Sequence, residues 1–181
     1  DLVDESVQSY YGIVDDGTVI VRNGGSANLT QRSISVVGFR DGKPVRGFAE
    51  NSPLPAGSKG WFVDLVPPSP GLPEGERIVT EGQVVNDVLV FASVIPTSEA
   101  CDPNGRGYLN ALDAFTGTST RPSYFDTNND GNFDNDTVTG GGVTVPIGSV
   151  DLGVGMPTLP GLLQGLAVVS GSGGGTGSVM T

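Results

Sequence analysis

Short runs of β-forming residues alternate with turn-forming residues along most of this chain. Three such runs are Tyr10 to Val14, Ser33 to Arg40 and Trp61 to Leu65. Asp15-Asp16-Gly17 and Asp41-Gly42 follow two of these runs and are typical of tight hairpin turns. Glycine occurs 29 times and proline 13 times in 181 residues, and both residue types interrupt helices. The sequence therefore predicts an all-β fold of short strands joined by turns.

The clearest local unit is a pair of strands in the middle of the chain. A continuously apolar run, Val88 to Val94, follows the turn at Asn86-Asp87. After an insertion, the alternating run Gly107 to Asp113 closes on Ala114-Phe-Thr-Gly117. A strand that is apolar throughout is expected to be buried on both faces, and Thr-Gly provides a tight exit. This pattern is typical of one repeat of a quinoprotein-type β-propeller, with a generic β-meander as the alternative.

The rest of the chain is organised in the same way. More strands are expected at Thr18 to Val21, Val45 to Ala49 and Glu76 to Thr80. The Gly/Ser-rich segment Gly171 to Gly177 predicts that residues 171–181 form either a mobile end or a truncated turn. A chain of this length is long enough for one domain with a real core, so residues 1–181 are taken as one domain piece. Because the chain begins at Asp1 within ordered-looking sequence, we expect it to be part of a larger protein.

The chain carries a strong negative charge. Nine basic residues against 20 acidic ones give a net charge of −11, and no basic cluster is present. Such a field repels nucleic acid and anionic membrane surfaces, so we expect neither as a partner. We also expect no membrane insertion, because the most apolar stretch, Leu159 to Ser170, is broken by proline and glycine. Divalent cations are the partners that this charge favours.

Two residue types that carry much of enzyme chemistry are scarce. The chain has no histidine, which removes the commonest general base and the commonest transition-metal ligand. Cys101 is the only cysteine, so neither an internal disulfide nor a Cys-rich zinc site is available. We interpret Cys101 as a buried apolar filler, with pairing to a cysteine outside this chain as the alternative. No Gly-x-Ser-x-Gly nucleophile motif occurs, and we expect no enzymatic activity.

The segment from Asp126 to Asp134 has the spacing of a calcium-binding loop. Its positions 1, 3, 5 and 9 carry oxygen-bearing side chains, which are Asp126, Asn128, Asp130 and Asp134. Gly131 stands at position 6, where an EF-hand loop bends sharply, and position 7 of such a loop contributes a backbone carbonyl. Three carboxylates so close together repel one another unless a divalent cation neutralises them. The alternative is a solvated turn, because Asn, Asp and Gly form such turns without metal.

The loop departs from an EF-hand at its end and in its flanks. Position 12 is Thr137 instead of a bidentate glutamate, and Asp136 comes one place too early. Arg121-Pro122-Ser123 precedes the loop and a run of three glycines follows it, so neither flank is expected to be helical. The sequence therefore predicts a calcium loop inserted between strands.

A series of short motifs is specific through its order and spacing. The motifs are Tyr11-Gly-Ile-Val-Asp15, Lys59-Gly-Trp-Phe-Val-Asp-Leu65, Gly75-Glu-Arg-Ile-Val79, Phe91 with Ile95-Pro96, Cys101, Leu109 to Gly117, the Asp-x-Asn-x-Asp-Gly-x-x-Asp loop and Gly155-Met-Pro-Thr-Leu-Pro160. Together they resemble the C-terminal domain of the PilY-type proteins, the adhesins and biogenesis factors at the tip of bacterial type IV pili. The resemblance extends over almost the whole chain.

This resemblance implies a fold and a ligand. The implied fold is a modified seven-bladed quinoprotein-like β-propeller with loop insertions, of which 181 residues can supply only the later blades, at about 50 residues or fewer per blade. The implied ligand is Ca²⁺. It would be held by the side chains of Asp126, Asn128, Asp130 and Asp134 and by the backbone carbonyl of Asn132.

The resemblance also implies a place of action. The chain would act in pilus assembly, in the control of extension and retraction, and in surface attachment. Its partners would be minor pilins at the pilus tip and a host or abiotic surface. Its location would be extracellular, at the pilus tip or on the bacterial cell surface.

Two other functions stay open at this point. One is a structural cell-surface domain rigidified by calcium, which differs from the adhesin only in its partner. The other is a fragment of a quinoprotein dehydrogenase or a glycosidase, and a glycosidase needs two carboxylates that flank a scissile bond. Asp64, Glu74 and Glu76 are the imaginable group, but we expect them to be solvated. Trp61 is expected to pack between blades and not to bind a glycan.

Overall fold

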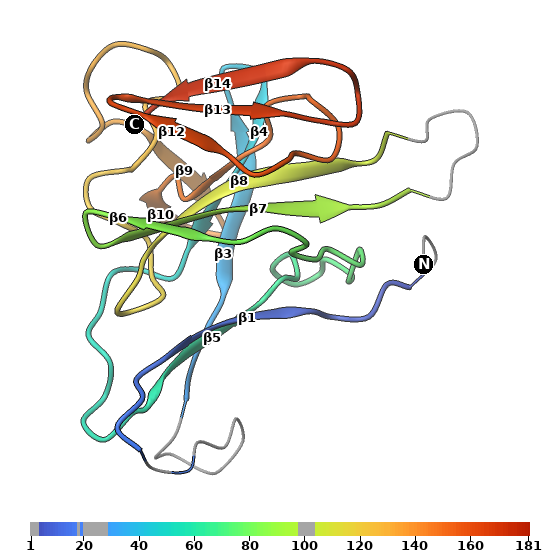
Figure 1. Ribbon diagram of the computed structural model, residues 1–181. Coiled ribbons are helices and arrows are strands. Elements are labelled where there is room, and N and C mark those ends of the chain that lie inside the picture. The colour runs from blue at the N-terminus through green and yellow to red at the C-terminus, as the bar shows by residue number, and fades with distance from the viewer. Residues whose placement is uncertain (1–3, 18, 20–28, 98–103) are drawn as a thin grey trace.

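Every regular element in the described part of the chain is a β-strand. The computed structural model describes residues 4–17, 19, 29–97 and 104–181 (Figure 1). These residues contain no helix, and so none that is long and apolar enough to span a membrane. The all-β prediction is confirmed. The strand expected over Thr18 to Val21, except for Val19, and the interpretation of Cys101 concern positions outside the described residues.

A six-stranded antiparallel sheet forms the centre of the molecule. Its order is β3-β4-β11-β8-β7-β6. The strands are β3 (Ile34–Arg40), β4 (Lys43–Phe48), β11 (Ser149–Val150), β8 (Arg106–Asp113), β7 (Val88–Ile95) and β6 (Gln83–Val85). The short strand β11 joins the early hairpin β3–β4 to the later meander β6–β7–β8, so the sheet combines segments far apart in the sequence.

Turn chemistry explains the hairpins of this sheet. Asp41 and Gly42 between β3 and β4 have φ angles of 49° and 78°. Asn86 and Asp87 between β6 and β7 have φ angles of 49° and 67°. Two-residue hairpin turns need this left-handed backbone, which Asn, Asp and Gly adopt most readily. The turns predicted at these two places are therefore confirmed.

Strands β7 and β8 are buried on both faces over nearly their whole length. They pair antiparallel from Val88 opposite Asp113 to Ile95 opposite Arg106. The continuous apolar run of β7 predicted this burial. The alternation of apolar and polar residues in β8 does not reflect an exposed face of the strand. Its polar positions Tyr108 and Asn110 are also buried, and Asn110 is hydrogen-bonded to Ser93. The predicted two-strand unit is thus confirmed.

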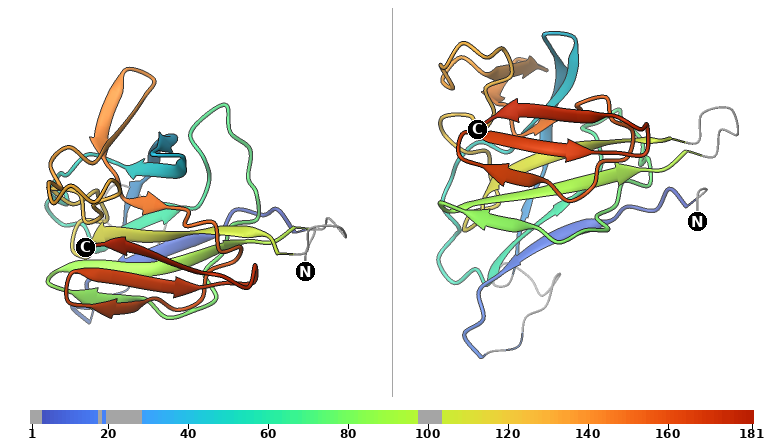
Figure 2. Two further views of the ribbon diagram at one scale, coloured as in Figure 1. Left: turned by 90° about the horizontal axis from the view of Figure 1, so that it is seen from above. Right: turned by 45° about the horizontal axis from the view of Figure 1, so that its top comes forward.

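Three smaller sheets accompany the central one. They are β1 (Ser9–Ile13), β5 (Gly60–Asp64) and β2 (Thr30–Arg32) in the order β1-β5-β2, the hairpin β9 (Thr137–Gly140) with β10 (Val143–Pro146), and β12 (Gly161–Leu163), β13 (Leu166–Ser170) and β14 (Thr176–Met180) in chain order. Figure 2 shows the β12–β13–β14 sheet lying along β7 and β8. The β1–β5–β2 sheet lies on the other side (Figure 1).

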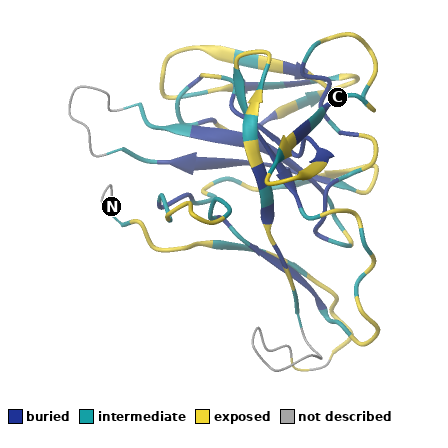
Figure 3. Cartoon of the chain, turned by 180° about the vertical axis from the view of Figure 1, so that it is seen from behind, coloured by how far each residue is buried: buried dark blue, intermediate teal, exposed yellow. Residues whose placement is uncertain are grey.

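Two hydrophobic cores occupy the two faces of the central sheet. On one face, Val90 and Ala111 pack with Val169 and Val179 of the C-terminal sheet. On the other face, Phe91 and other residues pack against Trp61 of β5. Figure 3 shows that the central strands are buried and that the turns and sheet edges are exposed. The alternation of side chains along β7 sends neighbouring residues into different cores.

Two segments differ from the conformation predicted for them, which was a strand for residues 76–80 and a mobile end or a truncated turn for residues 171–181. Residues 76–80 form no strand, since Arg77 alone makes a β-bridge, to Val94. Arg77 pairs with Val94 on the edge of β7 that β6 follows further along, and the neighbouring Glu76 side chain is buried. Residues 171–181 contain the connection of the β13–β14 hairpin and then β14, which pairs with β13 from Ser170 opposite Thr176 to Leu166 opposite Met180.

The propeller assignment stays a prediction. In the described residues no sheet closes on itself, and the central sheet has six strands where a propeller blade usually has four. The meander β6–β7–β8 has the up-and-down order of a blade, whereas β11, β4 and β3 extend it.

Candidate metal loop and buried polar network

The segment Asp126–Asp134 forms a tight loop that is fixed to the fold at its base. Asp126 makes a β-bridge with Met180 of β14, and its backbone N–H donates to the Met180 carbonyl at 3.0 Å. Asp126 is completely buried, whereas Asp130, Asn132 and Asp134 are exposed. The loop therefore begins in the core and ends at the surface.

The Asp126 carboxylate organises the turn from within. It accepts the Gly131 N–H at 2.8 Å and the Asp130 N–H at 3.3 Å. Gly131 has a φ of 78°, and no atom lies near the position of a Cβ, so the backbone conformation alone requires glycine there. The sharp bend predicted at loop position 6 is present.

The next side chains turn back onto the loop in the same manner. Asn128 Oδ1 accepts the Asp130 N–H at 3.1 Å, and Asp130 Oδ1 accepts the Asn132 N–H at 2.7 Å. Asn132 Oδ1 accepts the Asp134 N–H at 3.2 Å. Each is an Asx turn, which explains why Asx residues at alternate positions fold locally into a compact loop. The side-chain amide of Asn135, and then the Asn132 N–H, lower the pKa of Asp130 below its usual value.

The structure brings only part of the predicted ligand set together. Asp126, Asn128 and Asp130 are linked by hydrogen bonds, and Asn128 Nδ2 donates to Asp130 Oδ2 at 2.8 Å. Asp134 joins the loop through its backbone N–H, and its side chain is exposed. Among the described residues, no three acidic, cysteine or histidine side chains gather closely enough to hold a metal ion.

The donor chemistry of the loop fits a hard cation. Its side chains present carboxylate and amide oxygens, which are the ligands that Ca²⁺ prefers. Asn135 Oδ1 is buried and has no hydrogen-bond partner in the structure. The residues present therefore suit calcium by ligand type, and calcium binding is taken up as a proposal below.

Sequence reasoning missed two residues that complete the base of the loop. Asn135 Nδ2 donates to Asp130 Oδ2 at 2.7 Å. Asp136 is completely buried and accepts the Thr127 N–H at 2.9 Å as well as the Thr127 hydroxyl. The signal was the acidic residue one place before loop position 12, which the EF-hand pattern left without a role.

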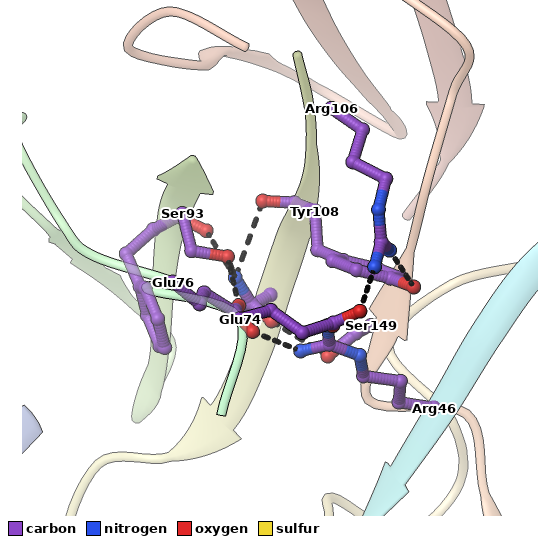
Figure 4. Close-up of polar contacts among 9 residues, drawn as sticks. Arg46, Glu74, Glu76, Ser93, Arg106, Tyr108 and Ser149 are labelled. Carbon is purple, nitrogen blue, oxygen red and sulfur yellow. Dashed lines mark hydrogen bonds and ion pairs between the residues drawn. The ribbon is translucent and has the colours of Figure 1, made fainter. Parts of the chain in front are cut away.

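A second polar group, the buried polar network, lies inside the fold and not at its surface (Figure 4). Arg46 Nη1 pairs with Glu76 Oε2 at 2.7 Å, with the Arg46 and Glu76 side chains 2% and 1% exposed. Ser93 donates its hydroxyl to Glu76 Oε1 at 2.5 Å. Asn110 Nδ2 donates to Ser93 Oγ at 2.9 Å, and Ser149 donates to Asn110 Oδ1 at 2.6 Å.

Strand register explains why these residues meet. Ser149 of β11 stands opposite both Arg46 of β4 and Asn110 of β8, so the three side chains share one face of the sheet. The Cζ atom of Arg46 lies 3.5 Å from the centre of the Tyr108 ring. Glu76 lies outside the strands of the sheet, and its carboxylate neutralises the positive charge of Arg46.

The prediction that Asp64, Glu74 and Glu76 are solvated is wrong for Glu76. Its burial follows from Arg46, a cation within a buried strand that a carboxylate must neutralise. Glu74 pairs instead with Arg106 near the surface. Desolvation works against the charged form of Arg106, yet the Glu74 carboxylate leaves the pKa of Arg106 raised. Asp64 accepts hydrogen bonds from Ser9 and Gln31, so the three acids form no common site.

The chain is similar to a curated protein and to a solved structure. No protein-family model matches it. Over 132 residues, 72% of this chain and 10% of the relative, it is 33% identical to the type IV pilus biogenesis factor PilY1 homolog of Xylella fastidiosa (strain Temecula1). The crystal structure of the Pseudomonas aeruginosa PilY1 C-terminal domain matches it with a TM-score of 0.70 and 21% identity, over 97% of this chain and 38% of that chain.

The two matches agree with the resemblance seen in the sequence motifs. The chain spans about a tenth of the curated relative and less than two fifths of the solved domain. The sequence match shows common ancestry, and the structural match shows the fold. The chain is therefore a homologue of a PilY1-type pilus biogenesis factor and has the fold of part of a PilY1 C-terminal domain.

Proposed function

We propose that this chain is a calcium-binding segment of a type IV pilus tip adhesin and biogenesis factor. The observation that carries the proposal is the Asp126–Asp134 loop, which folds around a buried carboxylate in a chain related to a PilY1 homolog. The loop has alternate oxygen ligands, and the described strands hold it at its base. Both features favour an ion-controlled surface loop over a plain connection.

The proposed ligands are those predicted from the sequence. Asp126, Asn128, Asp130 and Asp134 would provide side-chain oxygens, and Asn132 would provide its backbone carbonyl. The bound ion would supply positive charge to three carboxylates that otherwise repel one another. The buried end at Asp126 would transmit this order to strand β14 through the bridge to Met180.

The fold supports a finer architectural proposal. We assign the β6–β7–β8 meander and its neighbouring sheets to later blades of a modified seven-bladed β-propeller. The support is the match to part of the PilY1 C-terminal domain and the placement of Trp61 between the β1–β5–β2 sheet and the central sheet. Successive sheets that pack face to face through such cores are the building plan of propellers.

The proposed role is in pilus assembly, in control of extension and retraction, and in surface attachment. The partners would be minor pilins at the pilus tip and a host or abiotic surface, and the location would be extracellular. No catalytic role is proposed for the buried polar network, because its Arg46, Glu76, Ser93, Asn110 and Ser149 side chains are closed off from solvent. A charged network without access for a substrate can support the fold but not turnover.

Calcium titration of the metal-stripped protein tests the ligand assignment. Wild type is expected to bind one equivalent of Ca²⁺. At a free Ca²⁺ concentration of about 100 times Kd, binding to the folded state is expected to raise the free energy of unfolding by about 2.7 kcal/mol. Asp130→Ala and Asp130→Asn are expected to abolish the gain, and the second variant keeps a side chain that can form the Asx turn. Calorimetry and melting with and without calcium measure both effects.

Glu81→Ala is the matched control, since Glu81 is an exposed acid outside the loop and its loss changes the net charge equally. It is expected to bind calcium like wild type. A calcium-dependent rise in melting temperature that survived in Asp130→Ala would contradict the ligand assignment.

The pilus role needs a test in the bacterium that makes the full-length protein. Asp130→Ala in the chromosomal gene is expected to change the number of surface pili and twitching motility, while the level of the protein stays constant by immunoblot. Glu81→Ala is again the control. Normal piliation and motility in the Asp130→Ala strain would favour a calcium-rigidified structural domain of the cell surface over a regulator of the pilus.

A further inference from the structure

The base of the Asp126–Asp134 loop contains a second buried carboxylate, Asp136, which is not one of the proposed calcium ligands. Asp136 is 0% exposed, as is Asp126, and Thr127 between the first two ligand positions is 1% exposed. One oxygen of Asp136 accepts both the N–H and the hydroxyl of Thr127. This double contact closes the loop by joining the residue after the first ligand to the residue before β9.

The other oxygen of Asp136 has no hydrogen-bond partner, although it is buried. A buried carboxylate oxygen without a donor is unfavourable unless a positive charge lies nearby. The Lys43 ammonium donates to the Thr127 carbonyl at 3.3 Å, and among the described residues no lysine or arginine forms an ion pair with Asp136. The charge of Asp136 is therefore only partly balanced by the chain itself.

We infer that Asp136 is a positioning residue of the calcium loop, which fixes Thr127 and thereby sets the spacing of Asp126 and Asn128. This inference rests on the calcium-binding function proposed above. Through Thr127, Asp136 holds the peptide between the first two ligands in place before the ion arrives. Its charge adds to the negative potential that attracts a divalent cation to the loop.

The backbone of Asp136 extends the same role. Its carbonyl accepts the Ile147 N–H at 3.0 Å, and Ile147 is fully buried in the core between β10 and β11. Asp126 is held at the same time by Met180. Asp136 thus ties the end of the loop to the core while Asp126 ties its beginning. Outer residues that orient metal ligands typically change metal affinity by about 10–100-fold when mutated.

Asp136→Asn tests the inference, since asparagine keeps the shape and the oxygen that accepts from Thr127 but removes the charge. Calorimetry is expected to show a Kd for Ca²⁺ that is about 10–100-fold weaker than in wild type. The melting temperature in EDTA is expected to be no lower than that of wild type, because the substitution removes a buried charge that the calcium-free fold balances only in part. Thr127→Val, which removes one of the two donors to Asp136, is expected to weaken calcium binding less.

Asp151→Asn is the matched control, because Asp151 is also buried, accepts one backbone N–H, from Gly153, and lies outside the loop. It is expected to leave the Kd for calcium unchanged. Unchanged calcium affinity in Asp136→Asn, together with a lower melting temperature in EDTA, would overturn the inference and leave Asp136 a structural residue. Absence of calcium binding in wild type would instead overturn the proposed function, and the role of Asp136 with it.

Discussion

Arg46→Ala is expected to lower the free energy of unfolding by about 3–5 kcal/mol, the range found when one partner of a buried ion pair is removed. The substitution leaves the Glu76 carboxylate 1% exposed and without its cation. It also removes the stacking of Arg46 on Tyr108. Urea unfolding followed by the fluorescence of Trp61, the single tryptophan, measures the change as a shift of the midpoint at constant m-value.

Arg106→Ala is the matched control for Arg46→Ala. Arg106 also pairs with a glutamate, Glu74, but the two side chains are 42% and 35% exposed. Surface pairs of this kind contribute about 0–1 kcal/mol, so this variant is expected to unfold close to wild type. If both substitutions shifted the midpoint equally, burial would not be the reason for the importance of Arg46.

The double variant Arg46→Met, Glu76→Leu distinguishes two quantities. One is the net contribution of the ion pair to stability, and the other is the cost of leaving one buried charge without its partner. Apolar side chains of similar size often replace a buried ion pair without loss. We therefore expect the double variant to recover most of the stability that Arg46→Ala loses. Ser93 loses its acceptor in this variant, so a remaining deficit of about 1–3 kcal/mol would reflect the unsatisfied hydroxyl and not the charges.

Local chemistry explains why much of the fold could be predicted from the sequence. The hairpin turns at Asp41-Gly42 and Asn86-Asp87 need left-handed backbone, and the residue types that adopt it stand at these positions. The continuous apolar run of β7 is likewise a local signal, because it predicts burial without reference to the strand's neighbours. Strand β11 could not be predicted, because two residues, Ser149 and Val150, acquire strand character only by insertion between β4 and β8.

The candidate site shows the same difference between features set by neighbouring residues and features set by contacts distant in sequence. The Asx turns of the Asp126–Asp134 loop follow from neighbouring residues, so the spacing in the sequence was enough to predict a compact loop. The role of Asp136 depends on burial by the core around it, which the loop pattern does not contain. Glu76 was assigned to the surface because its partner Arg46 lies 30 positions away and becomes a neighbour only through the sheet. Charged residues whose partners are distant in sequence are where such reasoning fails.

Trp61→Ala is expected to lower the free energy of unfolding by about 3–5 kcal/mol, the usual range for loss of a buried tryptophan. Trp61 is 1% exposed and lies in the core between the β1–β5–β2 sheet and the central sheet. Its indole N–H donates to the Ala114 carbonyl at 3.0 Å, and its ring stacks near Tyr10 at a centroid distance of 6.3 Å. Trp61 is therefore buried, whereas the blades between which it was expected to pack stay part of the propeller proposal. Far-UV circular dichroism measures the transition, since the substitution removes the fluorophore.

Phe115→Ala is the control for aromatic loss without burial, because Phe115 is 66% exposed. It is expected to change stability by no more than about 0.5 kcal/mol. A loss as large as that of Trp61→Ala would mean that Phe115 is covered by a contact absent from this structure.

Gly12 gives a sharper test of how Trp61 packs. A Cβ built at Gly12 would overlap the indole ring of Trp61, so Gly12→Ala alone is expected to be destabilising. In the Trp61→Ala background the ring is gone and the same methyl group has room. The two substitutions should therefore be less damaging together than the sum of their separate effects, with a coupling of about 0.5–3 kcal/mol in a double-mutant cycle. Simple additivity would show that the indole ring does not lie against the backbone of β1, and the packing between the two sheets would have to be revised.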